Sequence, residues 1–351
     1  MKKKIINSIL VLLLISIICT STIYGYNSQE KYEYDDPNVS YKEYLYHNSP
    51  DMNQQLTSRN VIGLLARKYN IDLTEIGNSS IINYYYTGHW HLTMANRMQT
   101  LIDIMRFNML IPDPDKTKEY SWTDIPRNIS DQELAYINYA KELGITNGTG
   151  DFTFGFSQSI TYSQFNTFIT NIENIENLSQ YKVSYPLTII DTINCNNEKL
   201  AAPLIVEYFY TLPDKLVNKL SNWTFYLDGD NIPSYDNAVG LTIPVENTIE
   251  IISIDKTFRN YDFNETMIHE FGHAISWVGN RRLVNGIYPD TNILEEEMPK
   301  LPKGYRSYAG ENSDEYFACA WYWNYHIGDT LFSSVYPYTY ELFQSILDNY
   351  R

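Results

Sequence analysis

This sequence is short of cysteine and of basic residues, and beyond its first 25 positions it has no long apolar run. Of its three cysteines, only Cys195 and Cys319 lie outside those positions. Two cysteines do not make a disulfide framework, and whether these two pair is left open. A small fold stapled by disulfides is therefore excluded, and 351 residues are enough for two domains with a sizeable core.

Basic residues are outnumbered, with 26 Lys and Arg against 42 Asp and Glu and a formal net charge of −16. Removing the three lysines of the N-terminal leader described next takes the charge from −16 to −19. An acidic surface repels phosphate backbones, so we expect no nucleic-acid partner.

The N-terminus has the form of a secretory signal. Three lysines at positions 2–4 precede an apolar run over residues 9–19, and small or polar residues follow to Gly25. The run is too short to span a bilayer comfortably, so we predict a signal peptide over residues 1–25 and no transmembrane anchor after its removal. Residues 26–50 are rich in Tyr, Asp, Asn and Ser and are interpreted as a spacer. The mature protein is expected to be secreted.

Residues 51–180 show helical periodicity. Apolar residues recur three and four positions apart over 61–69 and again over 98–109, which predicts two amphipathic helices. A third helix is predicted after residues 130–133, Ser-Asp-Gln-Glu, which have the form of a capping box, and Gly144 ends it. We interpret this segment as a mainly helical domain.

Residues 181–351 mix strand and helix signals, which predicts an α+β fold for the chain as a whole. The predicted strands are residues 204–210, 224–227, 240–243 and 248–254, with the last two forming a hairpin. Pro213 is expected to open a short helix between the first two strands.

The sequence H-E-F-G-H at residues 269–273 gives this half its chemistry. His269 and His273 are four residues apart, so on a helix they share one face and can reach the same metal ion. Glu270 lies beside them, where its carboxylate can take a proton from an attacking water. We predict a helix with Asn264 as its N-cap and residues 279–280, Gly-Asn, as its end. The alternative is a core helix with two hydrogen-bonded histidines.

A catalytic zinc site needs a third protein ligand. The downstream candidates are Asp290, the acidic run 295–297, Glu311, Asp314, Glu315 and His326. Glu315 is favoured because it opens an apolar helix, capped by Asn312 or Ser313, where a carboxylate is costly unless it is paired with positive charge. The alternatives are that Glu315 only complements the helix dipole, or that His326 is the ligand, and the run 295–297 is most simply solvated surface.

Strands followed by a metal-binding helix are the layout of zincin proteases, in which an edge strand can hold an extended peptide. The H-E-F-G-H segment together with residues 308–318 resembles the catalytic domain shared by anthrax lethal factor and the secreted Pro-Pro endopeptidases of Gram-positive bacteria. The resemblance implies one Zn²⁺ held by His269, His273 and Glu315, with Glu270 as general base and Tyr308 as oxyanion donor. Tyr308 could instead be one more core tyrosine. Cys319 stands where that family often has a second acid.

The helical segment carries a second resemblance. Residues 122–165 contain an aromatic-x-Asp-x-Pro segment, a helix, a Gly-Ile-x-x-Gly turn and a second helix, and so resemble a surface-layer homology (SLH) repeat. Residues 56–65 look like the tail of a degraded preceding copy. Such modules bind cell-wall polysaccharide, usually as a set of three. The basic residue of the family's Thr-Arg pair is missing at Thr161-Tyr162.

Together these features predict an SLH-like helical domain over residues 51–180 and a zincin-type metallopeptidase domain over residues 181–351. The expected function is that of a secreted zinc metalloendopeptidase acting on extracellular or cell-surface proteins, with cell-wall polysaccharide as a further partner. Cleavage between prolines is suggested by the nearer secreted relatives. The alternative from another class is a wall-bound adhesion or scaffolding protein with an inactive protease-like domain.

Overall fold

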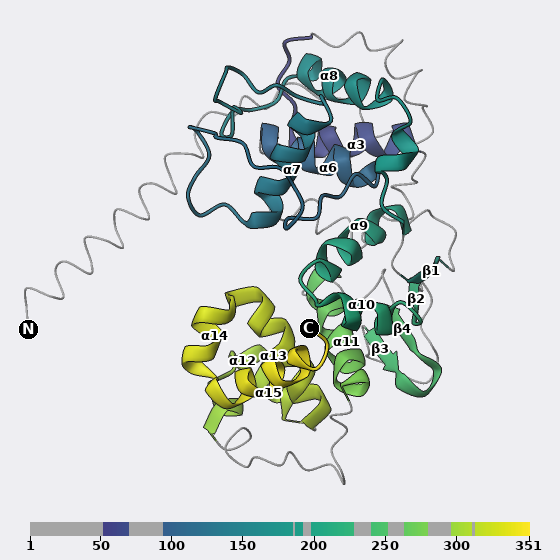
Figure 1. Ribbon diagram of the computed structural model, residues 1–351, viewed down its shortest axis with the longest axis vertical. Helices are drawn as coiled ribbons and strands as arrows, with labels where there is room; N and C mark the ends of the chain where they lie inside the picture. Colours follow the sequence, from purple (N-terminus) through teal and green to yellow (C-terminus); the bar gives the residue numbers. More distant parts are fainter. Residues whose placement is uncertain are drawn as a thin grey trace, which may run out of the picture. The chain divides into compact units, whose positions relative to one another are not determined.

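The computed structural model describes residues 52–69, 94–184, 187–191, 198–227, 240–251, 263–279, 296–310 and 313–351. These residues all belong to one compact unit, Pro37–Arg351. Within them the chain is α+β, with eleven α-helices and one four-stranded mixed sheet (Figure 1). The predicted signal peptide and spacer, residues 1–50, lie outside the described part. No helix within the described ranges is long and apolar enough to cross a bilayer.

The first half of the described chain is mainly helical, as predicted. Its helices are α3 (Ser58–Tyr69), α6 (Arg97–Phe107), α7 (Asp131–Glu142) and α8 (Tyr162–Glu173), followed by the 3-10 helix η1 (Leu178–Tyr181). The apolar stripes that predicted the first two helices are buried, and both helices are confirmed. The predicted capping box is present at Ser130 and Glu133, and Gly144 follows the end of α7 with a φ of +71°.

Three helices of this half start from a closed ring of backbone hydrogen bonds. The amide of Leu56 donates to the carbonyl of Ile160 (3.0 Å), the amide of Ile160 donates to Ala95 (2.9 Å), and the amide of Ala95 donates to Leu56 (2.8 Å). The residue after each ring member accepts a hydrogen bond from the amide three positions further on, which caps α3, α6 and α8. These caps are Thr57, Asn96 and Thr161. The three helix starts are therefore built alike.

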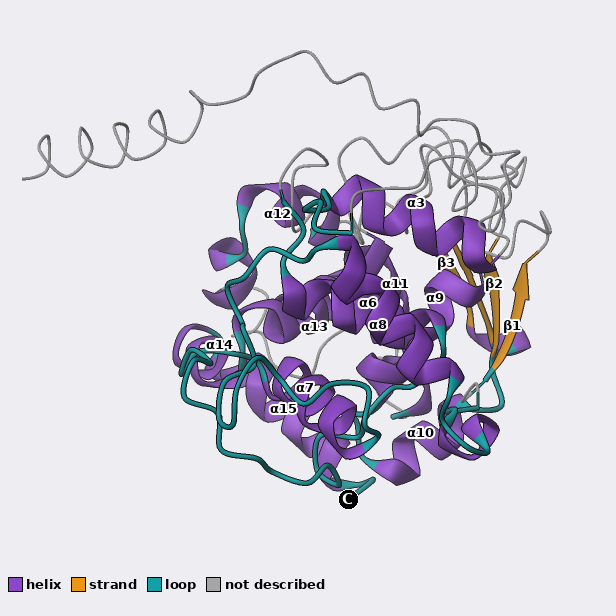
Figure 2. Cartoon of the chain, turned by 90° about the horizontal axis from the view of Figure 1, so that it is seen from above, coloured by secondary structure: helices purple, strands orange, loops and turns teal. Residues whose placement is uncertain are grey.

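The sheet has the order β1-β2-β4-β3, and its strands lie side by side in Figure 2. Strands β1 (Thr188–Asp191), β2 (Thr224–Leu227) and β4 (Thr248–Ile251) are parallel. Strand β3 (Gly240–Ile243) pairs antiparallel with β4 at one edge, after which the 3-10 helix η2 (Pro244–Glu246) makes the turn. The predicted strand at 224–227 and the predicted hairpin are confirmed, while β1 was not predicted.

The predicted strand over residues 204–210 is wrong, because residues 204–209 belong to α9 (Glu198–Phe209) and residue 210 follows it in a turn. Its Leu, Ile, Val, Tyr and Phe residues have high β-propensity, but tertiary packing overrides propensity when both faces of a segment are buried. Ala201, Leu204 and Tyr208 of α9 are almost fully buried. The helix predicted after Pro213 is confirmed as α10 (Asp214–Leu220).

Helix α9 has contacts on two sides. The carboxylate of Glu207 accepts two hydrogen bonds from the guanidinium of Arg106 on α6 (2.6 and 2.7 Å) and one from the hydroxyl of Tyr136 on α7 (2.6 Å). The next side chain, Tyr208, accepts a hydrogen bond from the indole of Trp321 in the C-terminal part (2.7 Å). The helical half and the C-terminal half thus meet on one helix.

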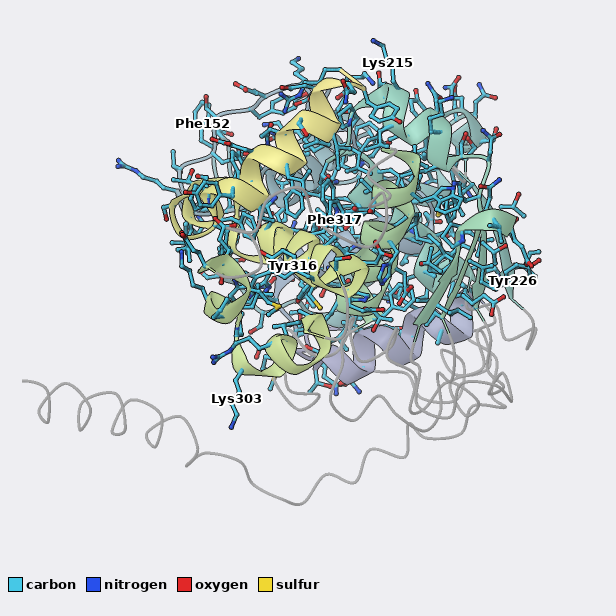
Figure 3. The ribbon with its side chains drawn as sticks, turned by 90° about the horizontal axis from the view of Figure 1, so that it is seen from below. Phe152, Lys215, Tyr226, Lys303, Tyr316 and Phe317 are labelled. Atoms are coloured by element: carbon cyan, nitrogen blue, oxygen red, sulfur yellow. The ribbon has the colours of Figure 1, made fainter. Side chains whose placement is uncertain are left out.

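The C-terminal part is a set of helices around two long ones. They are α11 (Phe263–Val278), the 3-10 helix η5 (Met298–Lys300), α12 (Lys303–Ala309), α13 (Ser313–Ile327), α14 (Asp329–Val335) and α15 (Pro337–Asp348). Tyr316 and Phe317 of α13 are buried in the core, whereas Lys303 projects outward (Figure 3). Helix α11 begins at Phe263, so Asn264 is inside the helix and its prediction as N-cap is wrong. The predicted end is confirmed at Gly279.

Candidate metal centre

The close crossing of α11 and α13 positions the candidate site. A Cβ atom built on Gly272 would lie 2.9 Å from the backbone Cα of Ala318, a distance that side chains do not tolerate. Glycine at the fourth position of the H-E-F-G-H segment therefore lets the two helices approach closely. The approach brings Glu315, in the first turn of α13, to the two histidines of α11.

His269, His273 and Glu315 converge on one point. The Nε2 atoms of the two histidines are 3.2 Å apart, and Oε2 of Glu315 lies 3.3 Å from Nε2 of His269 and 3.4 Å from Nε2 of His273. The three side chains are 13–19% exposed, so the cluster is largely but not fully shielded from solvent. The structure thus brings together the three residues that the sequence singled out.

These distances fit a metal ion. With zinc–nitrogen and zinc–oxygen distances of about 2.0–2.2 Å, two ligand atoms at a tetrahedral angle are about 3.3–3.6 Å apart. The three measured separations, 3.2, 3.3 and 3.4 Å, match that triangle within about 0.1 Å. Two imidazoles and one carboxylate are also a donor set that catalytic zinc uses. Hydrogen bonding between imidazole and carboxylate would hold the same atoms about as close, so the cluster alone does not identify an ion.

The cluster perturbs the titration of its own members. Burial works to raise the pKa of Glu315, but hydrogen bonds with His269 and His273 outweigh it and hold the pKa at about 2. Burial works to lower the pKa of His273, but Glu315 and the charge of Glu270 outweigh it and raise the pKa. An ionised carboxylate facing the imidazoles is therefore the favoured state.

Glu270 is 3% exposed, and the edge strand β3 covers its carboxylate. The hydroxyl of Thr242 lies 2.7 Å from Oε2 of Glu270 and 3.0 Å from the backbone oxygen of the same residue. A Cβ atom on Gly240 would lie 2.5 Å from Oε1 of Glu270. Neither strand residue was predicted to belong to the site. The signal for them is a short β-type run shortly before a zinc-type helix, but the sequence does not show which of its side chains face that helix.

Tyr308, the predicted oxyanion donor, lies in α12, but its side chain is outside the described part. Three positions earlier in α12, the hydroxyl of Tyr305 donates to Oε1 of Glu265 in the first turn of α11 (2.6 Å). Burial and the Glu265 hydrogen bond both raise the pKa of Tyr305. This contact fixes α12 against the helix that carries the histidines.

The remaining candidate ligands are elsewhere or not described. His326 lies near the end of α13, more than ten positions from Glu315, and stacks on Trp323 with ring centroids 5.2 Å apart. Asp314 is exposed. Asp290, Glu295 and Glu311 are outside the described residues.

Glu297 is a correction to the prediction of a solvated acidic run. It is fully buried at 0% exposure, and its carboxylate accepts hydrogen bonds from the amides of Tyr338 and Thr339, both at 2.9 Å, and from the Thr339 hydroxyl at 2.6 Å. It therefore caps the first turn of α15. A cap supplied by a residue 41 positions away leaves no local sequence signal.

Cys319 is a free, buried cysteine one turn after Glu315. Burial raises the pKa of its thiol to about 12, and the nearby carboxylates of Glu315, Glu265 and Glu270 act in the same direction. The thiol is therefore protonated at neutral pH and fills space beside the cluster. Cys195 is outside the described residues.

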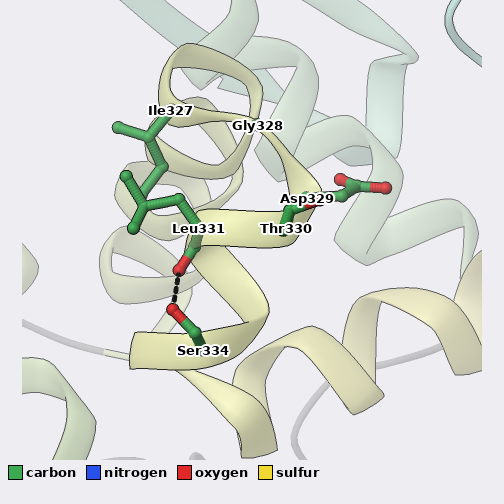
Figure 4. Close-up of a pocket in the computed structure, with 6 residues that line it drawn as sticks. All are labelled: Ile327, Gly328, Asp329, Thr330, Leu331 and Ser334. Atoms are coloured by element: carbon green, nitrogen blue, oxygen red, sulfur yellow. Dashed lines mark hydrogen bonds between the residues drawn. The ribbon is translucent and has the colours of Figure 1, made fainter.

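A surface pocket of about 480 Å³ lies apart from the cluster, at the junction of α13 and α14 (Figure 4). Leu331 and Ser334 line it, and the Ser334 hydroxyl donates to the Leu331 carbonyl at 2.7 Å. Asp329, on the same rim, accepts hydrogen bonds from Asn324 (3.1 Å) and Tyr340 (3.3 Å). These contacts serve the fold.

Neither a protein-family model nor a curated protein matches this chain.

Proposed function

We propose that this protein is a secreted zinc metalloendopeptidase that hydrolyses peptide bonds of extracellular or cell-surface proteins. The observation that carries the proposal is the triangle of His269, His273 and Glu315, with sides of 3.2–3.4 Å, beside the buried carboxylate of Glu270. Two of these groups come from one helix turn and a third from a distant helix, an arrangement that helix formation alone does not require.

In this proposal His269, His273 and Glu315 hold one Zn²⁺. Zinc, when bound, acidifies a water and polarises the scissile carbonyl. Glu270 accepts the proton of the attacking water and passes it to the leaving amine. Tyr308 donates a hydrogen bond to the tetrahedral oxygen, an interaction of a kind that is typically worth about 3 kcal/mol in the transition state.

Strand β3 is the proposed docking edge for the substrate. Among the strands of the described residues it pairs with β4 alone, and its residues Gly240–Ile243 are all half-buried. An extended peptide can add to such an edge through main-chain hydrogen bonds. The edge also lies over Glu270, so a peptide bound there would run past the base.

We also propose that the helical half is an SLH-like unit that binds cell-wall polysaccharide. Its support is the ring at Leu56, Ala95 and Ile160, because three equivalent helix starts fit a module that normally occurs as a set of three. Of the residues that follow the three caps, Arg97 alone is basic. It is 5% exposed and donates hydrogen bonds to the Phe154 carbonyl and the Thr146 hydroxyl, so its charge is used inside the fold.

The test of the enzymatic proposal combines metal analysis with peptide cleavage on the mature protein, Glu270→Gln and His273→Ala. We expect about one zinc per wild-type chain and cleavage of a peptide library in which Pro is varied on both sides of the scissile bond. Glu270→Gln should keep the zinc and lose about 100- to 10,000-fold in kcat/KM. His273→Ala should lose both.

Two outcomes would overturn the proposal. Wild-type protein without zinc would show that the cluster is a hydrogen-bonded one. Binding to wall polysaccharide with no cleavage by wild type or variants would favour the scaffolding alternative. Sedimentation with purified walls, before and after their polysaccharide is stripped, tests wall binding separately.

A further inference from the structure

Strand β3 touches Glu270 at two alternate positions. Gly240 and Thr242 are two residues apart on the strand, so they point to the same face of the sheet. At Thr242 the hydroxyl is 2.7 Å from the Glu270 carboxylate, and at Gly240 the carboxylate occupies the space that a side chain would need. One residue supplies a hydrogen bond and the other supplies room.

We propose that Thr242 and Gly240 are positioning residues for Glu270, which they hold in the orientation that the proton transfer needs. This inference rests on the proposed function for its catalytic consequence. Its physical content, that β3 fixes the Glu270 side chain, stands on the contacts alone.

A buried glutamate has several rotamers to choose from, and its carboxylate must be satisfied in whichever one it adopts. Glu270 is 3% exposed, so water cannot satisfy all of its carboxylate. The Thr242 hydroxyl at 2.7 Å selects the rotamer that faces β3. Because misplacement of a reacting group by about 1 Å can cost about 100-fold in rate, such a contact is expected to matter for catalysis.

The same hydroxyl can serve both protonation states of the base. When Glu270 is ionised, Thr242 donates to Oε2 at 2.7 Å. When Glu270 carries the proton taken from water, Thr242 can accept a hydrogen bond from the carboxyl and donate its own proton to the Glu270 backbone oxygen at 3.0 Å. The hydroxyl rotates and no proton is lost or gained by threonine. A valine of the same shape can do neither.

Gly240 is explained by the same contact. Glycine inside a strand weakens the strand, and it often marks a place where another group approaches closely. Here the approaching group is the end of the Glu270 side chain, at 2.5 Å from a hypothetical Cβ. The end of a flexible side chain can move aside, so Gly240→Ala is expected to leave the fold intact and to displace the carboxylate.

The experiment measures thermal unfolding and kinetics of zinc-loaded protein for Thr242→Val, Thr242→Ser and Gly240→Ala, each alone and with Glu270→Ala. Thr248→Val on β4 is the matched control, since the Thr248 hydroxyl bonds only the Glu246 carbonyl (3.3 Å) among the hydrogen bonds of the described residues. We expect Thr242→Val to lower the unfolding midpoint, and to have a much smaller effect when Glu270 is already alanine. The hydrogen bond from the Thr242 hydroxyl to the backbone oxygen of residue 270 exists whether residue 270 is Glu or Ala. Its loss in Thr242→Val therefore contributes equally to both measurements and cancels in the comparison. Gly240→Ala should be destabilising alone and relieved by Glu270→Ala.

In kinetics we expect Thr242→Val to lower kcat by about 10- to 100-fold with KM and zinc content little changed. Thr242→Ser should restore kcat to within about three-fold of wild type. Thr248→Val should leave kcat unchanged. A wild-type kcat for Thr242→Val, or equal losses for the valine and serine variants, would overturn the catalytic role.

Failure of the proposed function is separable from failure of this inference. If wild type cuts no peptide, the enzymatic proposal fails, while the unfolding measurements still decide whether Thr242 and Gly240 hold Glu270. If the effects of Thr242→Val or Gly240→Ala on unfolding simply add to that of Glu270→Ala, these residues do not hold the Glu270 side chain.

Discussion

Asp124 in the helical half and Glu315 in the C-terminal half are carboxylates with lowered pKa values and different partners. Partial burial works to raise the pKa of Asp124, but the amides of Phe154, Gly155 and Phe156 donate to it and lower the pKa. For Glu315 burial is outweighed by two imidazoles. The carboxylate of Asp124 is satisfied by backbone amides of its own half, whereas that of Glu315 faces two histidines of another helix, which is the arrangement that the proposed metal site requires.

The same contrast holds for glycine. Gly272 lies where α13 crosses α11, and a side chain there would meet backbone, whereas Gly63 in α3 has no atom within 4 Å of its missing Cβ. The contrast concerns these two positions and not the halves as wholes, because a Cβ atom on Gly148 in the helical half would clash with the carbonyl oxygen of Thr153. Substitutions at Glu315, Gly272, Asp124 and Asp103, with their controls, would sharpen or break this comparison.

The largest effect is expected for Glu315→Ala. Removing one of the three proposed zinc ligands should abolish zinc retention after dialysis and reduce peptide cleavage to background, because two imidazoles alone bind zinc weakly. Metal analysis by mass spectrometry checks this. Asp314→Ala, at the exposed neighbouring position, is the control and should keep both properties. Full zinc in Glu315→Ala would make Glu315 a structural carboxylate like Asp124.

Gly272→Ala is expected to destabilise the protein by about 1–3 kcal/mol, since its Cβ would press on the Ala318 backbone. It should also weaken zinc binding, because α11 and α13 must move apart. The same change at Gly63 should stabilise by about 0.5–1 kcal/mol through helix propensity. Denaturant unfolding of both variants measures the two effects. If both substitutions stabilised the protein, or both destabilised it, the comparison would be contradicted.

Asp124→Asn should cost about 1–2 kcal/mol at neutral pH, since a charged acceptor of three amides is replaced by a neutral one. The folded pKa is below the unfolded value of about 3.9, so this stabilisation is present above that value and is lost as pH falls through the folded pKa. The difference from wild type should therefore shrink in acid. Zinc content should not change.

The smallest effect is expected for Asp103→Asn in α6. Burial raises the pKa of Asp103 to about 7, against the opposing influence of Arg106 and of a hydrogen bond from Gln99. The folded protein therefore binds a proton that the unfolded chain releases near pH 4, so the contribution of Asp103 to stability falls as pH rises from about 4 to about 7. The stability of the variant relative to wild type should therefore increase as pH rises from about 5 to about 8. A difference independent of pH would contradict this.

Local signals in the sequence predicted the elements that they control locally. The capping box at Ser130, the stop at Gly144, the hairpin of β3 and β4 and the helix carrying residues 269–273 are all present. Each depends on residues within one or two turns of one another. The choice of Glu315 from several acids also matches the geometry, because its carboxylate lies in one group with His269 and His273.

The features that the sequence did not predict depend on contacts between segments that are far apart in the chain. The segment 204–210 is helical because of what packs on both its faces, and Glu297 is buried because its amide donors come from α15. The ring that includes Ala95 joins segments that are far apart in the chain. Thr242 meets Glu270 only through the register of the sheet edge. No local pattern encodes such contacts, so the sequence could not reveal them.

Helix α9 contacts both halves of the protein, so each half depends on it. Glu207 is paired with Arg106 of the helical half, and the ring of the adjacent Tyr208 packs at a tilt against that of Phe271, the residue after Glu270, with ring centroids 5.3 Å apart. Removing the helical half would leave Glu207 without its charge partner on an apolar surface. It would also loosen the packing behind Glu270. If the C-terminal half cuts peptides and the helical half binds cell wall, as proposed, the two activities would depend on each other through α9, and cleavage of the chain between the halves would abolish both.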